Sequence, residues 1–416
     1  MFQPKLWKDG EFLKLWWGQA VSELGSQVSA LALPTVAILI LSATPFQVGL
    51  LEALQFLAFP VLGLIAGVYA DRIRRRPIMI ACDVLRLVAL GSVPAAFVLG
   101  LLTIEQLYVV ALLVGVGTVF FDVAYQSYLP AIISRSDLVE GNSKLQVTGS
   151  VAQMVGPALA GFLIQLVGAA RAVTVDAASF FVSVLSLWWI RRPEPPPKPA
   201  SSEGGSTGFF SEMLEGIRFV IGNPTISRIA GSTATSNLGG NIVFAVYLIF
   251  AYRVLHLSPG TIGLVFAAGA VGGLLGALSA SWIAARIGVG PTLFVSITAG
   301  GLSLLLVPLA QFGFAIPLLI ASFFIGSWVN PVYNINQVSL RQAITPDRVQ
   351  GRMNATVRTI IWGTIPIGAL IGGTIGTVYG VLPAIYIGIA VSLLSGVWIL
   401  AGPIRLRVQP QPVGDV

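Results

Sequence analysis

The chain has 416 residues, of which 10% are charged and 55% hydrophobic, with a formal net charge of +7 and a mean hydropathy of +0.86. Soluble domains carry about 25% charged residues, and a soluble fold of this size could not bury so much apolar surface. The composition excludes a water-soluble protein and predicts one surrounded by lipid.

Twelve apolar segments follow one another along the chain, and each is long enough to cross about 30 Å of hydrocarbon as a helix. We place these spans at 13–41, 46–69, 78–101, 106–131, 145–168, 171–190, 226–252, 260–284, 291–311, 315–340, 355–378 and 381–401. We therefore predict an all-α membrane protein with twelve transmembrane helices.

The first span carries a row of polar residues at helical spacing: Gln19, Ser22, Glu23, Ser26 and Gln27. Such a row indicates a hydrated face that lines a central cavity. Glu23 is our first candidate for a residue that takes up and releases a proton in each transport cycle. The alternative is a neutral, hydrogen-bonded acid that only shapes the cavity or contacts a cationic substrate.

The loop after the second span places five charges in six residues, from Asp71 to Arg76. Its position between two apolar spans predicts a cytoplasmic hinge. A plain positively charged inner loop would explain Arg72, Arg74, Arg75 and Arg76, but it would not explain the acid.

Other charges lie within the spans, where each is expensive unless it is paired or hydrated. They are Glu52, Asp83, Arg86, Asp122 and Asp176. Arg86 and Asp122 each lie about 13 Å from the cytoplasmic edge at 1.5 Å per residue, so we predict an ion pair between them. We expect Asp176 to pair locally with Arg171, and Glu52 to lie near the outer surface.

The segment after the sixth span, 191–207, is rich in Pro, Gly and Ser and is typical of a linker. Residues 209–221 alternate apolar and charged side chains, which predicts an amphipathic helix on the membrane surface. We therefore divide the chain into an N-terminal six-helix half at 1–190, a cytoplasmic linker at 191–225, and a C-terminal half with a short cytoplasmic tail at 226–416.

The two halves repeat each other. Identical residues recur at a spacing of 214 positions: Leu24-Gly25 and Leu238-Gly239, Pro45 and Pro259, Gly49 and Gly263, Arg72 and Arg286, Pro77 and Pro291. A second register, offset by four, rests on Asp137 and Asp347, Val139 and Val349, and Gly141 and Gly351. The repeat predicts a related pair of bundles, as in many secondary transporters.

The C-terminal half offers polar and aromatic cavity candidates in place of charges. They are Thr233, Ser236, Asn237 and Asn241 in the span 226–252, Trp328, Asn330, Tyr333, Asn334 and Gln337 in the span 315–340, and Trp362 in the span 355–378. A cavity with such walls favours bulky, largely apolar substrates over sugars or phosphates. Hydrogen bonding between helices is the alternative role for these residues.

Basic residues orient the chain. If both termini are cytoplasmic, the outer loops keep only Arg171 and Arg253, while the other loop bases lie inside, as the positive-inside rule requires. Topology accounts for the net charge, so we expect no nucleic-acid partner. The single Cys82 excludes an intramolecular disulfide and a multi-cysteine metal site, and the single His256 cannot build a histidine metal site. We expect no cofactor and no enzymatic activity.

The chain resembles the major facilitator superfamily, within it the branch of bacterial exporters that includes macrolide-efflux and enterobactin-export proteins. The loop motif of that superfamily is matched by Gly67, Asp71, Arg72, Arg75 and Arg76, although Arg74 stands where the family has glycine. The resemblance implies that Asp71 faces the start of the span 355–378 and that the arginines lock the outward-facing state. It also offers Arg75 as another partner for Asp122.

A second match is Gly156, Pro157 and Gly161, which is similar to the glycine-proline motif that exporters carry in the fifth helix. The resemblance implies a proton-coupled exporter of drugs or bulky secondary metabolites that works by alternating access. A siderophore exporter and an importer of the same fold remain open, and a polytopic membrane enzyme is a less favoured alternative. We further expect a monomer in the inner membrane of a bacterium, with protons, a small-molecule substrate and the lipid bilayer as its partners.

Overall fold

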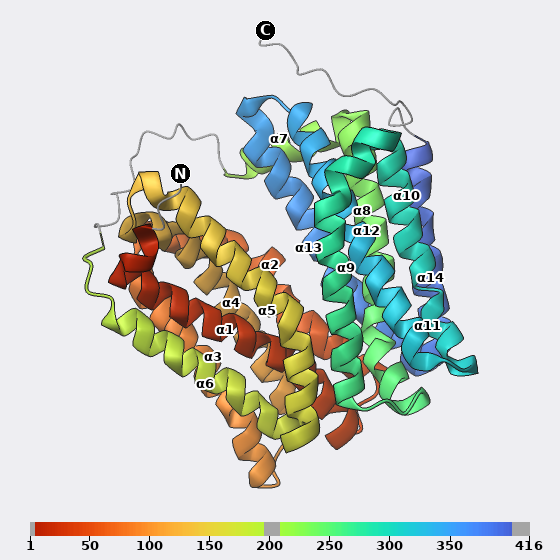
Figure 1. Cartoon of the computed structure of the whole chain (residues 1–416), viewed down its shortest axis with the longest axis horizontal. Helices are drawn as coiled ribbons and strands as arrows, with labels where there is room; N and C mark the ends of the chain where they lie inside the picture. Colours follow the sequence, from red (N-terminus) through yellow and green to blue (C-terminus); the bar gives the residue numbers. More distant parts are fainter. Residues whose placement is uncertain (1–4, 195–208, 402–416) are drawn as a thin grey trace. The chain divides into compact units, whose positions relative to one another are not determined.

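The computed structural model describes residues 5–194 and 209–401, and the described residues form helices and short connections without strands (Figure 1). The helices are α1 (Gly10–Thr35), α2 (Pro45–Arg72), α3 (Arg75–Val98), α4 (Ile104–Ile132), α5 (Leu138–Val167), α6 (Ala169–Trp189), α7 (Phe209–Gly222), α8 (Pro224–Ile249), α9 (Pro259–Ile287), α10 (Val289–Ser303), α11 (Leu306–Leu309), α12 (Ala315–Ala343), α13 (Asp347–Val378) and α14 (Val381–Leu400).

Twelve segments of the described chain are helical, long and apolar enough to cross a membrane. Helix α1 continues through a π-helical turn, η2 (Val36–Ile40), and α8 continues through another, η4 (Phe250–Val254). Helices α10 and α11 together form one span, while α7 is too short to cross a bilayer. The prediction of twelve transmembrane helices is confirmed.

The chain divides into two compact units. The described residues of unit 1 fall within 1–43, 54–202 and 258–267, and those of unit 2 within 44–53, 203–257 and 268–416. The units thus differ from the predicted halves at two places, because the first residues of α2 belong to unit 2 and those of α9 to unit 1. Each unit is described by itself below.

In unit 1, α1 packs along α6 and α5, and α3 packs against α4 and α6 (Figure 1). Helix α1 begins at Gly10 because Asp9 caps it, with Oδ1 accepting from the backbone N–H groups of Glu11 at 3.0 Å and Phe12 at 3.3 Å. Behind this cap, Phe12 packs into a cluster with Met79 and Tyr128, all of which are fully buried. The cap and the cluster fix the start of α1, which carries the candidate residues farther along.

Unit 2 repeats this arrangement, with α8 packed along α14 and α13 and α10 against α12 and α14. Corresponding glycines make the close contacts. A Cβ on Gly25 would lie 2.6 Å from Cβ of Ser179 on α6, and a Cβ on Gly239 would lie 2.5 Å from the carbonyl oxygen of Gly388 on α14. The predicted internal repeat is therefore a repeat of helix packing as well as of sequence.

The predicted helix at 209–221 is present as α7, Phe209–Gly222. It packs on α13: a Cβ on Gly216 would approach the backbone of Arg352, and Val220 is buried with Met353 and Val357. Glu215 forms ion pairs with Arg352 and with Arg348, the latter at 3.1 Å. One face of α7 is therefore covered by α13, whereas the apolar Leu214 is 44% exposed. The predicted placement of this helix on the membrane surface stays a prediction.

Two close contacts between backbones occur at the start of α2, which belongs to unit 2, and at the start of α9, which belongs to unit 1. A Cβ on Gly49 of α2 would lie 2.3 Å from the carbonyl oxygen of Ala369 on α13 and 3.1 Å from Cα of Gly373. Within unit 1, a Cβ on Gly263 of α9 would lie 2.6 Å from the carbonyl oxygen of Pro157 on α5. Only glycine permits such an approach without a shift of the backbone.

Candidate functional site

Unit 1 contains a polar pocket of about 260 Å³ between α1, α4 and α5. Its wall combines one carboxylate and a phenol with several amides and a hydroxyl, from Gln19, Glu23, Tyr125, Asn142, Leu145, Gln146, Thr148, Gly149 and Gln153. Helix α5 supplies most of this wall, although the sequence argument named none of its polar residues. The signal was present as amide and hydroxyl side chains at 146, 148 and 153 inside the span 145–168, with Asn142 just before it.

Glu23 is the only carboxylate in the lining of this pocket, and its side chain is exposed. Arg86 and Tyr125 lie within electrostatic range of it. Gln19 is buried beside the pocket, and its Nε2 has no hydrogen-bond partner among the residues that the structure describes. A carboxyl group in the wall of a polar pocket can exchange a proton, or can accept a hydrogen bond from a ligand.

Arg86 on α3 lies behind this pocket, where it is 5% exposed. It forms an ion pair with Asp83, one turn earlier on the same helix, and its guanidinium carbon lies 4.2 Å from the ring centre of Phe180 and 4.5 Å from that of Phe121. The ion pair that we predicted from depth alone, with Asp122, is thus replaced by one with Asp83. A partner at i−3 is already held at the right distance by the helix.

Asp122 lies on α4 in the same region, where its charge acts on Cys82 and Tyr125. Its negative charge is therefore part of the electrostatic surroundings of Arg86, together with Glu23, Asp83 and Asp176. The proposed pairing of Asp122 with Arg75 remains a proposal from the resemblance. Arg75 itself bonds to Glu194.

Asp176 on α6 is 1% exposed and faces α1. The hydroxyl of Ser179 donates to its Oδ1 at 3.1 Å, and Ser26 and Ser29 of α1 lie beside the carboxylate, with Arg86 in electrostatic range. The expected local pair with Arg171 is replaced by these hydroxyls, and Arg171 is exposed. The side chain turns inward because Gly25 leaves room for it on α1.

The loop motif lies at the junction of α2 and α3. Gly67 has open space where a Cβ would be and Arg72 is exposed, while the side chain of Asp71 lies outside the described part of the structure. Arg75 and Arg76 donate their backbone N–H groups to Glu194, at 2.7 Å and 3.2 Å. Glu194 therefore caps the N-terminus of α3, where a helix dipole favours a carboxylate.

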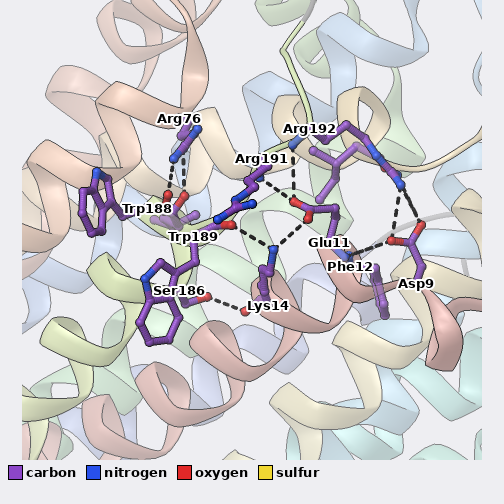
Figure 2. Close-up of polar contacts among 12 residues, drawn as sticks. Asp9, Glu11, Phe12, Lys14, Arg76, Ser186, Trp188, Trp189, Arg191 and Arg192 are labelled. Atoms are coloured by element: carbon purple, nitrogen blue, oxygen red, sulfur yellow. Dashed lines mark hydrogen bonds and ion pairs between the residues drawn. The ribbon is translucent and has the colours of Figure 1, made fainter.

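Arg76 also closes the end of α6 (Figure 2). Nε of Arg76 donates to the carbonyl oxygen of Leu187 at 2.8 Å, and Nη2 donates to that of Trp188 at 2.6 Å. The last carbonyl groups of a helix have no partner within it, so Arg76 satisfies two of them. The basic motif thus ties α3 to α6.

A second group of charges holds the chain just after α6 (Figure 2). Nζ of Lys14 donates to the carbonyl oxygen of Trp189 at 2.8 Å, and Glu11 accepts from the backbone N–H of Arg191 at 2.7 Å. Arg192 pairs with the capping residue Asp9 at 3.2 Å. Membrane topology was the only reason predicted for these bases, whereas the structure shows that Lys14 caps the end of α6 and that Arg192 pairs with the residue that caps α1.

The fifth-helix motif makes close contacts within unit 1. A Cβ on Gly156 would lie 2.5 Å from Cβ of Gln27 on α1, and a Cβ on Gly161 would lie 2.5 Å from the carbonyl oxygen of Pro259 at the start of α9. Small residues at these positions are therefore needed for packing.

Unit 2 contains an apolar pocket of about 410 Å³, lined by Leu275, Leu278, Ser279, Trp282, Phe324 and Trp328. The indole Nε1 of Trp328 donates to the hydroxyl of Ser279 at 3.0 Å. Of the other candidates in unit 2, Asn330 and Asn334 are exposed, Asn241 donates to the carbonyl oxygen of Asn237 at 2.8 Å, and Trp362 lies under Arg358.

Groups of three or more histidine, cysteine or acidic side chains that could hold a metal ion are absent from the described residues.

Comparison with known proteins identifies the family. Residues 6–410 match the family described as transmembrane secretion effector. The enterobactin exporter EntS of Citrobacter koseri is 27% identical over 394 residues, which is 91% of this chain and 89% of that protein. The enterobactin exporter EntS of Salmonella typhi is 26% identical, with 91% and 90% covered.

Solved structures show the same fold. A bacterial homologue of the iron transporter ferroportin has a TM-score of 0.75 at 17% identity, covering 94% of this chain and 98% of that one. The nucleoside transporter NupG has a TM-score of 0.70 at 15% identity, covering 94% and 98%. The chain belongs to the transmembrane secretion effector family of the major facilitator superfamily, and it is a multi-pass membrane transporter.

Proposed function

We propose that this transporter is a proton-driven exporter of bulky organic molecules, such as drugs or secondary metabolites. Glu23 is the proton carrier in this proposal, and the observation that carries it is the position of this single carboxylate in the wall of the polar pocket. Arg86 and Asp83 keep their charges throughout the cycle in this proposal, because they form a buried ion pair. Only Glu23 changes its charge.

In this proposal the charge state of Glu23 couples proton movement to substrate binding. When Glu23 is ionised, it attracts a proton or a hydrogen-bond donor of the substrate, and it cannot hold both at full strength. A proton that enters from the side of low pH therefore weakens substrate binding, and release of that proton restores it. Such competition at one carboxyl is sufficient for antiport.

The aromatic pocket of unit 2 supports a bulky, largely apolar substrate, because Trp282, Phe324 and Trp328 offer stacking area with one hydroxyl beside it. A siderophore is the second candidate, and the names of the relatives favour it. We further propose a monomer in a bacterial inner membrane with both termini in the cytoplasm, since nearly all loop bases fall on that side.

Everted membrane vesicles with an imposed pH gradient test this function. Vesicles with the wild-type protein should accumulate at least one member of a panel of macrolides, dyes and siderophores, and accumulation should collapse with the gradient. Glu23→Gln should remove the dependence on the gradient. Glu105→Gln is the matched control, because Glu105 lies in the first turn of α4, away from the pocket. Uptake by Glu23→Gln that follows the gradient unchanged would refute the role of Glu23.

A further inference from the structure

A buried polar row follows one face of α12 in unit 2. Tyr333, Gln337 and Arg341 recur at intervals of four residues, and they are 7%, 2% and 5% exposed. This spacing places the three side chains on one side of the helix, about 6 Å apart along its axis at 1.5 Å per residue. Asn336, which is also buried, lies next to the row.

Among the described residues, Arg341 is a buried cation without a counter-charge. Its Nε and Nη1 have no hydrogen-bond partner, and no carboxylate within residues 5–194 and 209–401 forms an ion pair with it. The sequence offers few acids here, because Asp347 is the only one between positions 216 and 401. A position in the last turn of α12 gives Arg341 some compensation from the helix dipole, but much less than burial of an unpaired guanidinium costs.

Gln337 leaves an acceptor unused one turn away. Its Nε2 donates to Oδ1 of Asn334 at 2.8 Å, whereas its buried Oε1 has no partner in the described part of the chain. The neighbours are satisfied. Tyr333 bonds to Thr233 at 2.8 Å, and Asn336 donates to the carbonyl oxygen of Val332 at 2.8 Å. Unused hydrogen-bonding capacity in this row is therefore concentrated at Gln337 and Arg341.

We infer that Arg341 and Gln337 form a binding site for an organic anion that carries a hydrogen-bond donor about one helical turn from its anionic group. A guanidinium presents a planar pair of donors that matches a carboxylate or a similar oxyanion. The amide oxygen of Gln337 accepts from a hydroxyl or N–H group of the same molecule. This inference rests on the proposed function, since the anionic group belongs to the transported substrate.

Three small probes test the chemistry of the site. The first, 3-hydroxybenzoate, carries both the anionic group and the hydrogen-bond donor at a suitable separation. 3-Hydroxybenzamide lacks the charge and benzoate lacks the donor. Binding of each is measured to the purified full-length protein in phosphatidylcholine nanodiscs, by a radioligand assay and by the shift in unfolding temperature. The wild-type protein should bind 3-hydroxybenzoate about tenfold or more tightly than either analogue, as expected for the loss of a charge-assisted hydrogen bond.

Two variants separate the two contacts. Arg341→Gln should bind 3-hydroxybenzoate no better than 3-hydroxybenzamide, and Gln337→Leu should bind it no better than benzoate. Arg286→Gln should behave as wild type, since Arg286 is another base in the last turn of a unit 2 helix but is exposed. Without ligand, Arg341→Gln should fold and unfold at the wild-type temperature or above it, because it removes an unpaired buried charge.

Equal binding of the three probes, or retention of charge preference by Arg341→Gln, would overturn the site. A lipid phosphate could supply the same anion, so the assay is repeated in nanodiscs with phosphatidylglycerol. Competition of that lipid with 3-hydroxybenzoate, lost in Arg341→Gln, would overturn the substrate site in favour of a lipid site. If the vesicles transport neutral compounds while the three probes bind alike, the proposed function stands and this inference fails.

Discussion

Ser42 and His256 adopt the same left-handed backbone conformation, each with a φ of 52°, two residues after the π-helical turns η2 and η4. They occupy corresponding positions of the two repeats, although they share no side-chain chemistry. The repeat is therefore conserved in backbone geometry at a point where identity of sequence is lost. The one histidine of the chain serves this turn, which is a structural role.

Replacement of His256 by glycine should stabilise the protein. A non-glycine residue in the left-handed region is disfavoured by about 1–2 kcal/mol, and part of that is returned because glycine has more freedom in the unfolded chain. We expect His256→Gly to raise the unfolding free energy by about 0.5–1 kcal/mol. His256→Val should lower it, and thermal unfolding in detergent measures both. Equal stability of the two variants would contradict a strained turn.

Replacement of Gly49 by alanine should damage packing in unit 2. The new Cβ would meet the carbonyl oxygen of Ala369 at 2.3 Å, and backbone cannot move aside as a side chain can. Overpacking of this kind costs about 1–3 kcal/mol. Gly63→Ala is the control on the same helix, because nothing lies within 4 Å of its Cβ position. The yield of folded protein and its unfolding temperature should fall only for Gly49→Ala.

Glu194→Gln should loosen the start of α3. The change removes the charge that caps the helix and pairs with Arg75 at 3.4 Å, where Glu194 itself is 5% exposed. Loss of a cap and its dipole interaction lowers stability by about 1–2 kcal/mol. Hydrogen exchange should quicken in the first turn of α3. Arg74→Gln changes a charge in the same loop whose side chain is exposed, and it should leave exchange in α3 unaltered.

Asp83 and Arg86 should show strong energetic coupling. Arg86→Gln leaves a buried carboxylate without its partner, and such losses cost about 3–5 kcal/mol. The double variant Asp83→Asn with Arg86→Gln should recover a substantial part of that loss. Thermal unfolding of the four proteins in this cycle gives the coupling. A larger coupling of Arg86 to Asp122 than to Asp83 would restore the pairing expected from sequence.

Hydropathy and spacing predicted the spans and the repeat because both are local or periodic properties. Gly25 and Gly239 marked the repeat correctly, since close packing of helices requires glycine at both places. The ion pair of Arg86 was predicted with Asp122, whereas the structure shows it with Asp83. Depth in the membrane indicates which residues lie at the same height, but it does not determine the direction in which a side chain points.

The roles of residues that act through distant partners could not be predicted from the sequence. Glu194 lies in a segment that composition marks only as a linker, and its contact with Arg75 joins positions 119 residues apart. Arg341 was counted among the inner-loop bases, so its burial could not be recognised from charge alone. The interval of four between Tyr333, Gln337 and Arg341 was the available signal.

The contact of Gly49 with α13 sets an order of events during synthesis. The ribosome makes α2 early, but its partner residues Ala369 and Gly373 follow some 320 positions later. At about 5–20 residues per second, α2 waits roughly 15–60 s in the bilayer before the partner residues of Gly49 have been made. Gly263 has no such delay, because α5 precedes it in the chain. A slow ribosome or a truncated message therefore leaves the start of α2 without its partner on α13, whereas the start of α9 is made after its partner on α5.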